Sequence, residues 1–95
     1  MKESHVVDIL KSKVEANGGE VRKAEWIGRR FCPDLRVMHP RRCFWVEAKS
    51  PTGRLSGGQE REIARLRSLG EDVVIVRSIE DVLQVLVESG ILPPM

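Results

Sequence analysis

An unbroken run of four apolar residues, Val73–Val76, constrains the fold of this chain more than any other feature. It follows an amphipathic segment that begins at Ser56 and stops at Gly70. A short run in which every residue is apolar is typical of a strand covered on both faces, as parallel strands are inside an α/β sheet. The sequence therefore predicts that this strand runs parallel to an earlier strand and is joined to it by a helical crossover.

Apolar spacing and turn residues predict the remaining elements. Val6, Leu10 and Val14 form one stripe of a first helix, and Gly18 and Gly19 follow its end. The predicted elements are helices over 3–16, between Ser56 and Gly70 and between Ser78 and Gly90, and strands over 21–26, 34–38, 43–49 and 73–76. The order α-β-β-β-α-β-α indicates a single α/β domain over residues 1–95.

Charge is distributed unevenly along the chain. Residues 1–54 contain twelve Lys and Arg against seven Asp and Glu, a net charge of +5, whereas residues 55–95 contain four against seven, a net charge of −3. A basic half favours a polyanionic partner, because Lys and Arg neutralise phosphates and release counterions. A solvated charged surface is the alternative interpretation.

The cysteines and the hydropathy of the chain indicate the cellular compartment in which the protein is found. Cys32 and Cys43 are far apart and lack the partners of a zinc site, so we expect two reduced thiols. We expect no signal peptide and no membrane-spanning segment, since no apolar run approaches about 20 residues. These observations predict a cytoplasmic protein with no membrane partner.

Two neighbouring strands carry the residues that are suited to metal binding and catalysis. Glu47 and Lys49 alternate with apolar residues, so both point to one face of their strand. A hairpin turn brings Asp34, at the start of the preceding strand, opposite that pair. Two close carboxylates repel each other, and a divalent cation such as Mg²⁺ relieves the repulsion by accepting both. With a lysine beside the cation, the arrangement suits hydrolysis of a phosphodiester.

The same residues have a plainer interpretation. Glu47 and Lys49 can be an exposed pair on a sheet face, with Asp34 a turn residue. Trp45, Val46 and Ala48 favour the chemical interpretation because they mark a central strand, where charges cost free energy unless they are used.

A longer pattern surrounds these residues. In chain order it consists of Glu3 in the first helix, Gly18-Gly19, Lys23, Gly28-Arg29-Arg30, Pro33-Asp34, Glu47-Ala48-Lys49, Leu55-Ser56, Gln59, and Gly70 before a Val-rich strand that ends at Arg77-Ser78. This pattern resembles the VRR-NUC branch of the PD-(D/E)xK nuclease superfamily over nearly the whole chain. The resemblance implies a restriction-endonuclease-like α-β-β-β-α-β core with a mixed central sheet flanked by helices. It also implies an endonuclease that requires Mg²⁺ or Mn²⁺.

The resemblance assigns roles to individual residues. It implies a site with catalytic Asp34, Glu47, Lys49 and Gln59, and with Glu3, Asp34, Glu47 and the carbonyl of Ala48 as metal ligands. Glu20 is a rival to Glu3. Gln59 also stands three residues after Ser56, the spacing of a capping box, so a structural role is open for it. Phe31 departs from the pattern, which usually has Gly there, and its bulk either alters the loop beside the substrate path or fixes that loop by packing.

Basic residues around the site are expected to bind DNA phosphates. They are Lys23, Arg29, Arg30, Arg41, Arg42 and Arg54. Trp26 and Trp45 are expected to pack in the core or at a subunit interface rather than to stack on bases. The apolar segment over 91–95, together with the last helix, indicates a surface that a second copy of the chain buries.

The expected substrate follows from the family. Stand-alone members of this branch, often phage-encoded, resemble Holliday-junction resolvases, which act as dimers. The resemblance therefore implies a homodimer that cuts branched or junction DNA in a bacterial or phage-infected cell. The alternatives are a catalytically inactive DNA-structure-binding module of the same fold, an RNA-directed nuclease, and a subunit that works only in a larger complex.

Overall fold

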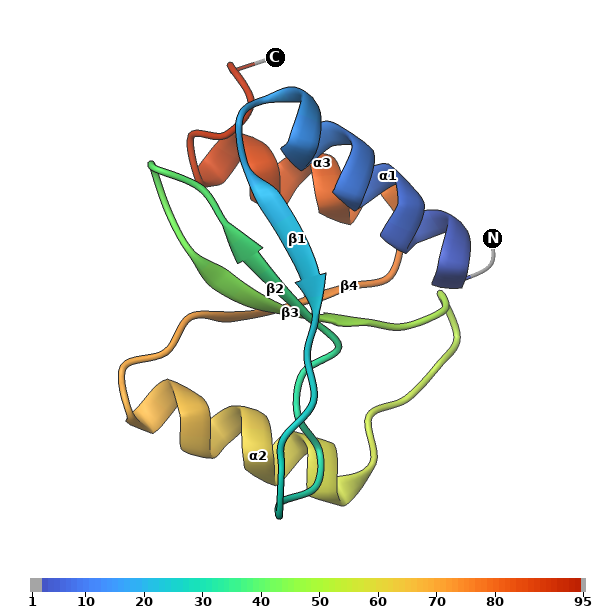
Figure 1. Ribbon diagram of the computed structural model, residues 1–95. Helices are drawn as coiled ribbons and strands as arrows, with labels where there is room; N and C mark the ends of the chain where they lie inside the picture. Colours follow the sequence, from blue (N-terminus) through green and yellow to red (C-terminus); the bar gives the residue numbers. More distant parts are fainter. Residues whose placement is uncertain (1–2, 95) are drawn as a thin grey trace.

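A four-stranded mixed sheet forms the centre of the protein, with helices on both of its faces (Figure 1). The computed structural model describes residues 3–94. In chain order the elements are α1 (Glu3–Ala16), β1 (Glu20–Lys23), β2 (Leu35–Met38), β3 (Phe44–Ala48), α2 (Gly57–Ser68), β4 (Val73–Val76) and α3 (Ile79–Glu88). The strands lie in the order β1-β2-β3-β4. The first two pairs are antiparallel, and β3 and β4 are parallel, which confirms the predicted crossover.

One strand is shorter than its sequence pattern predicts. The strand expected over 21–26 ends at Lys23, and its ladder continues only through the bond from the Ala24 N–H to the Asp34 carbonyl, 3.0 Å long. Trp26 packs on the Trp45 ring and donates a hydrogen bond to Glu62 of α2, so the chain turns away from β2 after Ala24, and positive φ angles follow at Gly28 (75°) and Phe31 (67°). Residues 24–34 therefore form a loop that leaves the sheet edge and lies beside α2 (Figure 1).

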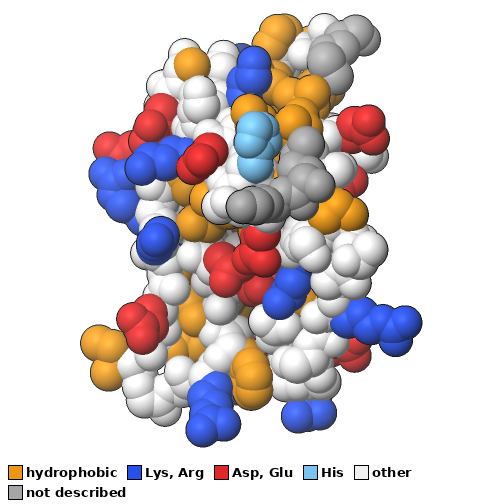
Figure 2. Space-filling view, turned by 90° about the vertical axis from the view of Figure 1, so that its right-hand side faces the viewer, with side chains coloured by type: hydrophobic (Ala, Val, Ile, Leu, Met, Phe, Trp, Pro, Cys, Tyr) orange, Lys and Arg blue, Asp and Glu red, His pale blue; other side chains and the backbone are white. Residues whose placement is uncertain are grey.

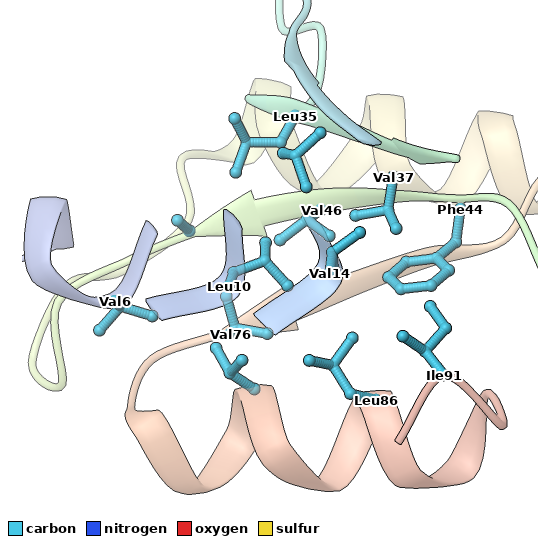
Figure 3. Close-up of a cluster of buried hydrophobic side chains, with 13 residues drawn as sticks. Val6, Leu10, Val14, Leu35, Val37, Phe44, Val46, Val76, Leu86 and Ile91 are labelled. Atoms are coloured by element: carbon cyan, nitrogen blue, oxygen red, sulfur yellow. The ribbon is translucent and has the colours of Figure 1, made fainter. Parts of the chain in front are cut away.

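The larger core lies between the sheet and the helices α1 and α3. Leu10, Val14, Val37, Val46 and Leu86 are fully buried there (Figure 3). Each such side chain contributes about 1.5–3 kcal/mol relative to an exposed one. The predicted helical stripe of α1 thus faces the sheet, and the alternation along β3 sends its neighbouring side chains to the other face.

Helix α2 covers that other face with a smaller core. Ile63 and Leu66 pack on Val73, and Trp26 and Trp45 lie at the edge of this cluster. The two indole rings meet edge to face with centroids 5.2 Å apart. This contact confirms that both tryptophans serve packing.

The chain's last described residues pack on its own core. Ile91 is buried and Leu92 packs against the same cluster as α1 and α3. Ile91 is therefore not part of the expected partner surface, because its own domain buries it, whereas Leu92 stays partly accessible. Met95 lies outside the described residues. Among the described helices, none has the length and apolarity needed to cross a membrane.

Candidate active site

Asp34 and Glu47 meet at the open end of the β2–β3 hairpin. Leu35 pairs with Val46 in the sheet register, so the residues that flank this pair, Asp34 and Glu47, are neighbours. The Asp34 Oδ2 atom accepts a hydrogen bond from the Ala48 N–H at 3.0 Å, which fixes the carboxylate against β3. Glu47 is only 2 % exposed, since α2 covers its face of the sheet.

Lys49 completes this group from the end of β3. Its Nζ lies 3.8 Å from Glu47 Oε2. The Lys49 N–H donates to the Val76 carbonyl at 2.9 Å, so the parallel strand holds the lysine backbone in place. The structure therefore brings together the three residues that the sequence placed at the centre of the site. Figure 2 faces this end of the molecule and shows acidic side chains at its centre with Lys and Arg side chains around them.

The electrostatics of Glu47 are unfavourable for a free carboxylate. Burial, followed by the charge of Asp34, raises the pKa of Glu47 to about 7. The Lys49 ammonium lowers this pKa, and the charge of Glu3 raises it further. The site thus concentrates more negative charge than Lys49 neutralises.

Gln59 forms the capping box that its sequence position suggested and also contacts Glu47. Its Oε1 accepts from the Ser56 N–H at 2.9 Å, and its own N–H donates to Ser56 Oγ at 3.1 Å, which together form a capping box. Its Nε2 donates to Glu47 Oε2 at 3.4 Å. The Gln59 side chain therefore caps the N-terminus of α2 and also contacts the buried carboxylate of Glu47.

Glu3 and Glu20 lie at opposite ends of the sheet. Glu3, at the first turn of α1, lines a hollow together with Lys23 and Asp34. Glu20 pairs with Met38 at the far end of β1 and forms an ion pair with Arg22 at 3.2 Å. Of the two candidate glutamates, only Glu3 shares a surface with Asp34.

The expected DNA-binding residues divide into two groups. Arg29, Arg30 and Lys23 lie near the open end of the hairpin, and Arg54 is exposed in the loop after β3. Arg41 and Arg42 do not flank Asp34, because their turn connects β2 and β3 at the opposite end. Arg42 there forms an ion pair with Asp72 and lies over the Phe44 ring.

Glu62 is an organising residue that the sequence interpretation missed. It is 4 % exposed and accepts hydrogen bonds from Trp26 Nε1 and from the guanidinium groups of Arg29 and Arg65. These contacts attach the loop over 24–34 to α2. The sequence does contain a sign of this role, because Glu62 is a charged residue four positions before Leu66 and therefore lies on the buried face of an amphipathic helix.

The donors fit a hard divalent cation. Within residues 3–94 no group of three or more His, Cys, Asp and Glu residues is arranged to hold a metal ion, so a cation would share the two carboxylates with backbone and water oxygens. Asp34 and Glu47 are oxygen donors, and the charge of Asp34 adds to the cost of ionising the buried Glu47. A dication relieves that cost, which makes this pair a suitable partner for Mg²⁺ or Mn²⁺.

Removal of the Glu47 charge is expected to stabilise the metal-free protein at high pH. An acid with a higher pKa in the folded chain contributes fully below its unfolded pKa, and this contribution is lost as the pH rises through the folded value of about 7. Glu47→Gln should therefore raise the free energy of unfolding in EDTA by on the order of 2 kcal/mol at pH 8 and by much less at pH 4.5. Urea denaturation measures this, with exposed Glu15→Gln as control. Equal gains at both pH values would contradict it.

The fold and the placement of these residues define a class. A mixed sheet in α-β-β-β-α-β order, with two carboxylates and a lysine at the end of its central hairpin, is the arrangement of a restriction-endonuclease-like nuclease domain. A solved structure of a "VRR_NUC domain" superposes on this chain with a TM-score of 0.81 at 38% sequence identity. The match covers 90% of this chain and 94% of that chain. The chain belongs to the VRR-NUC family, and it is a nuclease-type DNA-processing domain.

Two further comparisons add nothing to this assignment. No family model matches the sequence, and no curated protein matches it.

Proposed function

We propose that this protein is an endodeoxyribonuclease that hydrolyses phosphodiester bonds at branched DNA, with Mg²⁺ or Mn²⁺ as cofactor. The observation that carries the proposal is the group formed by Asp34, Glu47 and Lys49. Two carboxylates in contact range, one of them buried, are unfavourable on their own account. The free-energy cost of this arrangement is explained if the two carboxylates take part in the chemistry of the site.

The residues have separate tasks in the proposed reaction. Asp34, Glu47 and the Ala48 carbonyl would hold the cation, with Glu3 as a further ligand. When bound, Mg²⁺ or Mn²⁺ supplies Lewis-acid stabilisation of phosphate charge and lowers the pKa of a bound water. Lys49 donates hydrogen bonds to the oxygens on which negative charge develops. Gln59 holds Glu47 in position through the contact described above.

The basic residues would orient the substrate. We propose phosphate contacts for Lys23, Arg30 and Arg54, which surround the open end of the hairpin. Arg29 belongs to this group, although Glu62 already holds its guanidinium. Arg41 and Arg42 would contact only DNA that extends along β2 and β3 to the opposite end of the sheet.

A homodimer is proposed for the acting species. With Ile91 and Leu92 folded onto their own core, the remaining candidate surface is a mainly apolar hollow on α3, lined in part by Leu83 and Val87. Two sites related by a twofold axis would suit paired cuts on a symmetric four-way junction. Light scattering after gel filtration should give twice the chain mass. A monomer at micromolar concentration would contradict the dimer.

A panel of substrates tests the proposed activity. Labelled four-way junction, flap and linear duplex are incubated with Mg²⁺, Mn²⁺ or EDTA, and matched RNA substrates are included. We expect cutting of branched DNA that EDTA abolishes, with little cutting of RNA. Tight junction binding without cutting under any metal would favour the inactive binding module. Equal cutting of RNA would favour the RNA-directed nuclease. The free thiols of Cys32 and Cys43 are compatible with the reducing cytoplasm in which we place this activity.

A further inference from the structure

Phe31 has a backbone conformation that its residue type disfavours. Among residues 3–94 it alone has a positive φ without being glycine, at 67°. Bulky side chains rarely adopt this region, since Cβ approaches the following carbonyl. The side chain is nevertheless 44% exposed, so burial gives the strained backbone only partial compensation. An outlier of this kind suggests a functional constraint.

The ring of Phe31 is held against the first turn of α2. A Cβ atom added to Gly58 would come within 2.2 Å of the Phe31 Cζ, so only glycine leaves room for the ring at this place. Gly58 directly precedes Gln59, whose amide contacts Glu47. The ring therefore lies against the first turn of α2, at the residue before Gln59, and is still open to solvent.

Arginines surround the exposed part of the ring. Phe31 lines two hollows, and the one on the α2 side is also lined by Arg29, Arg30, Arg61, Glu62 and Arg65. Four arginines against one glutamate give this hollow a net charge of +3. Glu62 pairs with Arg29 and Arg65, whereas Arg30 and Arg61 form no ion pair within the described part of the chain. Two guanidinium groups thus remain available beside a solvent-exposed aromatic ring.

We propose that this hollow is a platform for an unpaired nucleotide next to the scissile phosphate, with its base stacked on Phe31 and its phosphates on Arg30 and Arg61. Aromatic rings beside cations are the general means of binding single-stranded DNA. A paired base is already stacked on its neighbours, so the platform selects DNA with an unpaired or easily unstacked nucleotide at the cut. The inference rests on the proposed function and narrows its substrate to such DNA.

A purely structural role for Phe31 makes different predictions. If the ring only covers α2, Phe31→Leu, which keeps an apolar side chain at this position, should serve nearly as well. If a base stacks on the ring, Phe31→Leu should weaken DNA binding, whereas Phe31→Trp should retain it. The matched control is Ile27→Ala, which removes a fully exposed apolar side chain from the same loop.

The test measures binding of the full chain to flap and four-way-junction DNA in EDTA, with 2-aminopurine at successive positions around the branch point. We expect wild type to change the fluorescence at one unpaired position. Phe31→Leu should lose that change and bind roughly tenfold more weakly, with Ile27→Ala unaffected. Arg61→Gln and Arg30→Gln should each make DNA affinity less dependent on salt concentration, by the amount expected for the loss of about one phosphate contact.

The outcomes separate the platform from the nuclease. Phe31→Leu with wild-type binding and fluorescence would overturn the platform, as would a lowered melting temperature with binding unchanged. Because the assay contains no metal, its result does not depend on whether the protein cuts DNA. Failure of wild type to bind any DNA would overturn both the proposed function and the platform.

Discussion

Lys49→Ala is expected to reduce the single-turnover rate of DNA cutting roughly 10²–10³-fold, the cost of removing one donor that stabilises transition-state charge. DNA binding should change little, because one ammonium among many basic groups contributes a small part of phosphate affinity. The rate is measured on the preferred branched DNA with saturating Mn²⁺. Exposed Lys13→Ala, at the last turn of α1, is the matched control.

Two results would contradict this role for Lys49. Cutting within a few fold of wild type would show that the lysine is only a partner of Glu47, from whose Oε2 it lies 3.8 Å away. An equal loss in Lys13→Ala would point to a general effect of charge. The loss must therefore be specific to Lys49 and confined to the chemical step.

Glu62→Ala is expected to lower the free energy of unfolding by about 2–3 kcal/mol, less than a fully buried pair would lose, because Arg29 and Arg65 are partly exposed. The substitution leaves the Trp26 Nε1–H without its acceptor and frees the loop over 24–34 from α2. In a chain of this size the melting temperature should fall by about 10–20 °C. Glu60→Ala, exposed on the same helix, is the control.

The effect of Glu62 should also depend on pH. Hydrogen bonds from Arg65 and Arg29 hold the pKa of Glu62 well below its usual range. An acid with a lowered folded pKa stabilises the protein above its unfolded pKa, and this stabilisation is lost as the pH falls. The difference between wild type and Glu62→Gln should therefore shrink below about pH 4. A difference that stays constant from pH 7 to pH 3 would mean that the charge of Glu62 contributes nothing.

Local patterns were sufficient to predict the architecture. The apolar run over 73–76 required a covered parallel strand, and glycines and capping serines marked where helices end and begin. The alternation along β3 placed Glu47 and Lys49 on one face, and the hairpin supplied Asp34. These inferences succeeded because each depends on residues close together in sequence or on one hairpin.

The features that were missed depend on contacts between distant segments. The sequence pattern of residues 24–26 predicts a strand, but Trp26 packs against Trp45 and donates a hydrogen bond to Glu62, so these residues lie outside the sheet. Arg41 and Arg42 seemed to flank the site because they adjoin its strands, but the register places their turn at the other end. The ring of Phe31 lies on Gly58 across a loop and a helix, and no local pattern predicts that contact.

The central claim is that Asp34 and Glu47 together hold a divalent cation, and calorimetric titration with Mn²⁺ tests it most directly. Wild type should bind Mn²⁺ and release protons near pH 6, because the pKa of Glu47 is raised to about 7. Asp34→Asn should weaken this binding at least roughly tenfold, while exposed Asp8→Asn should leave it unchanged. If Asp34→Asn binds Mn²⁺ as wild type does, the two carboxylates are not a metal site and the proposed mechanism is wrong.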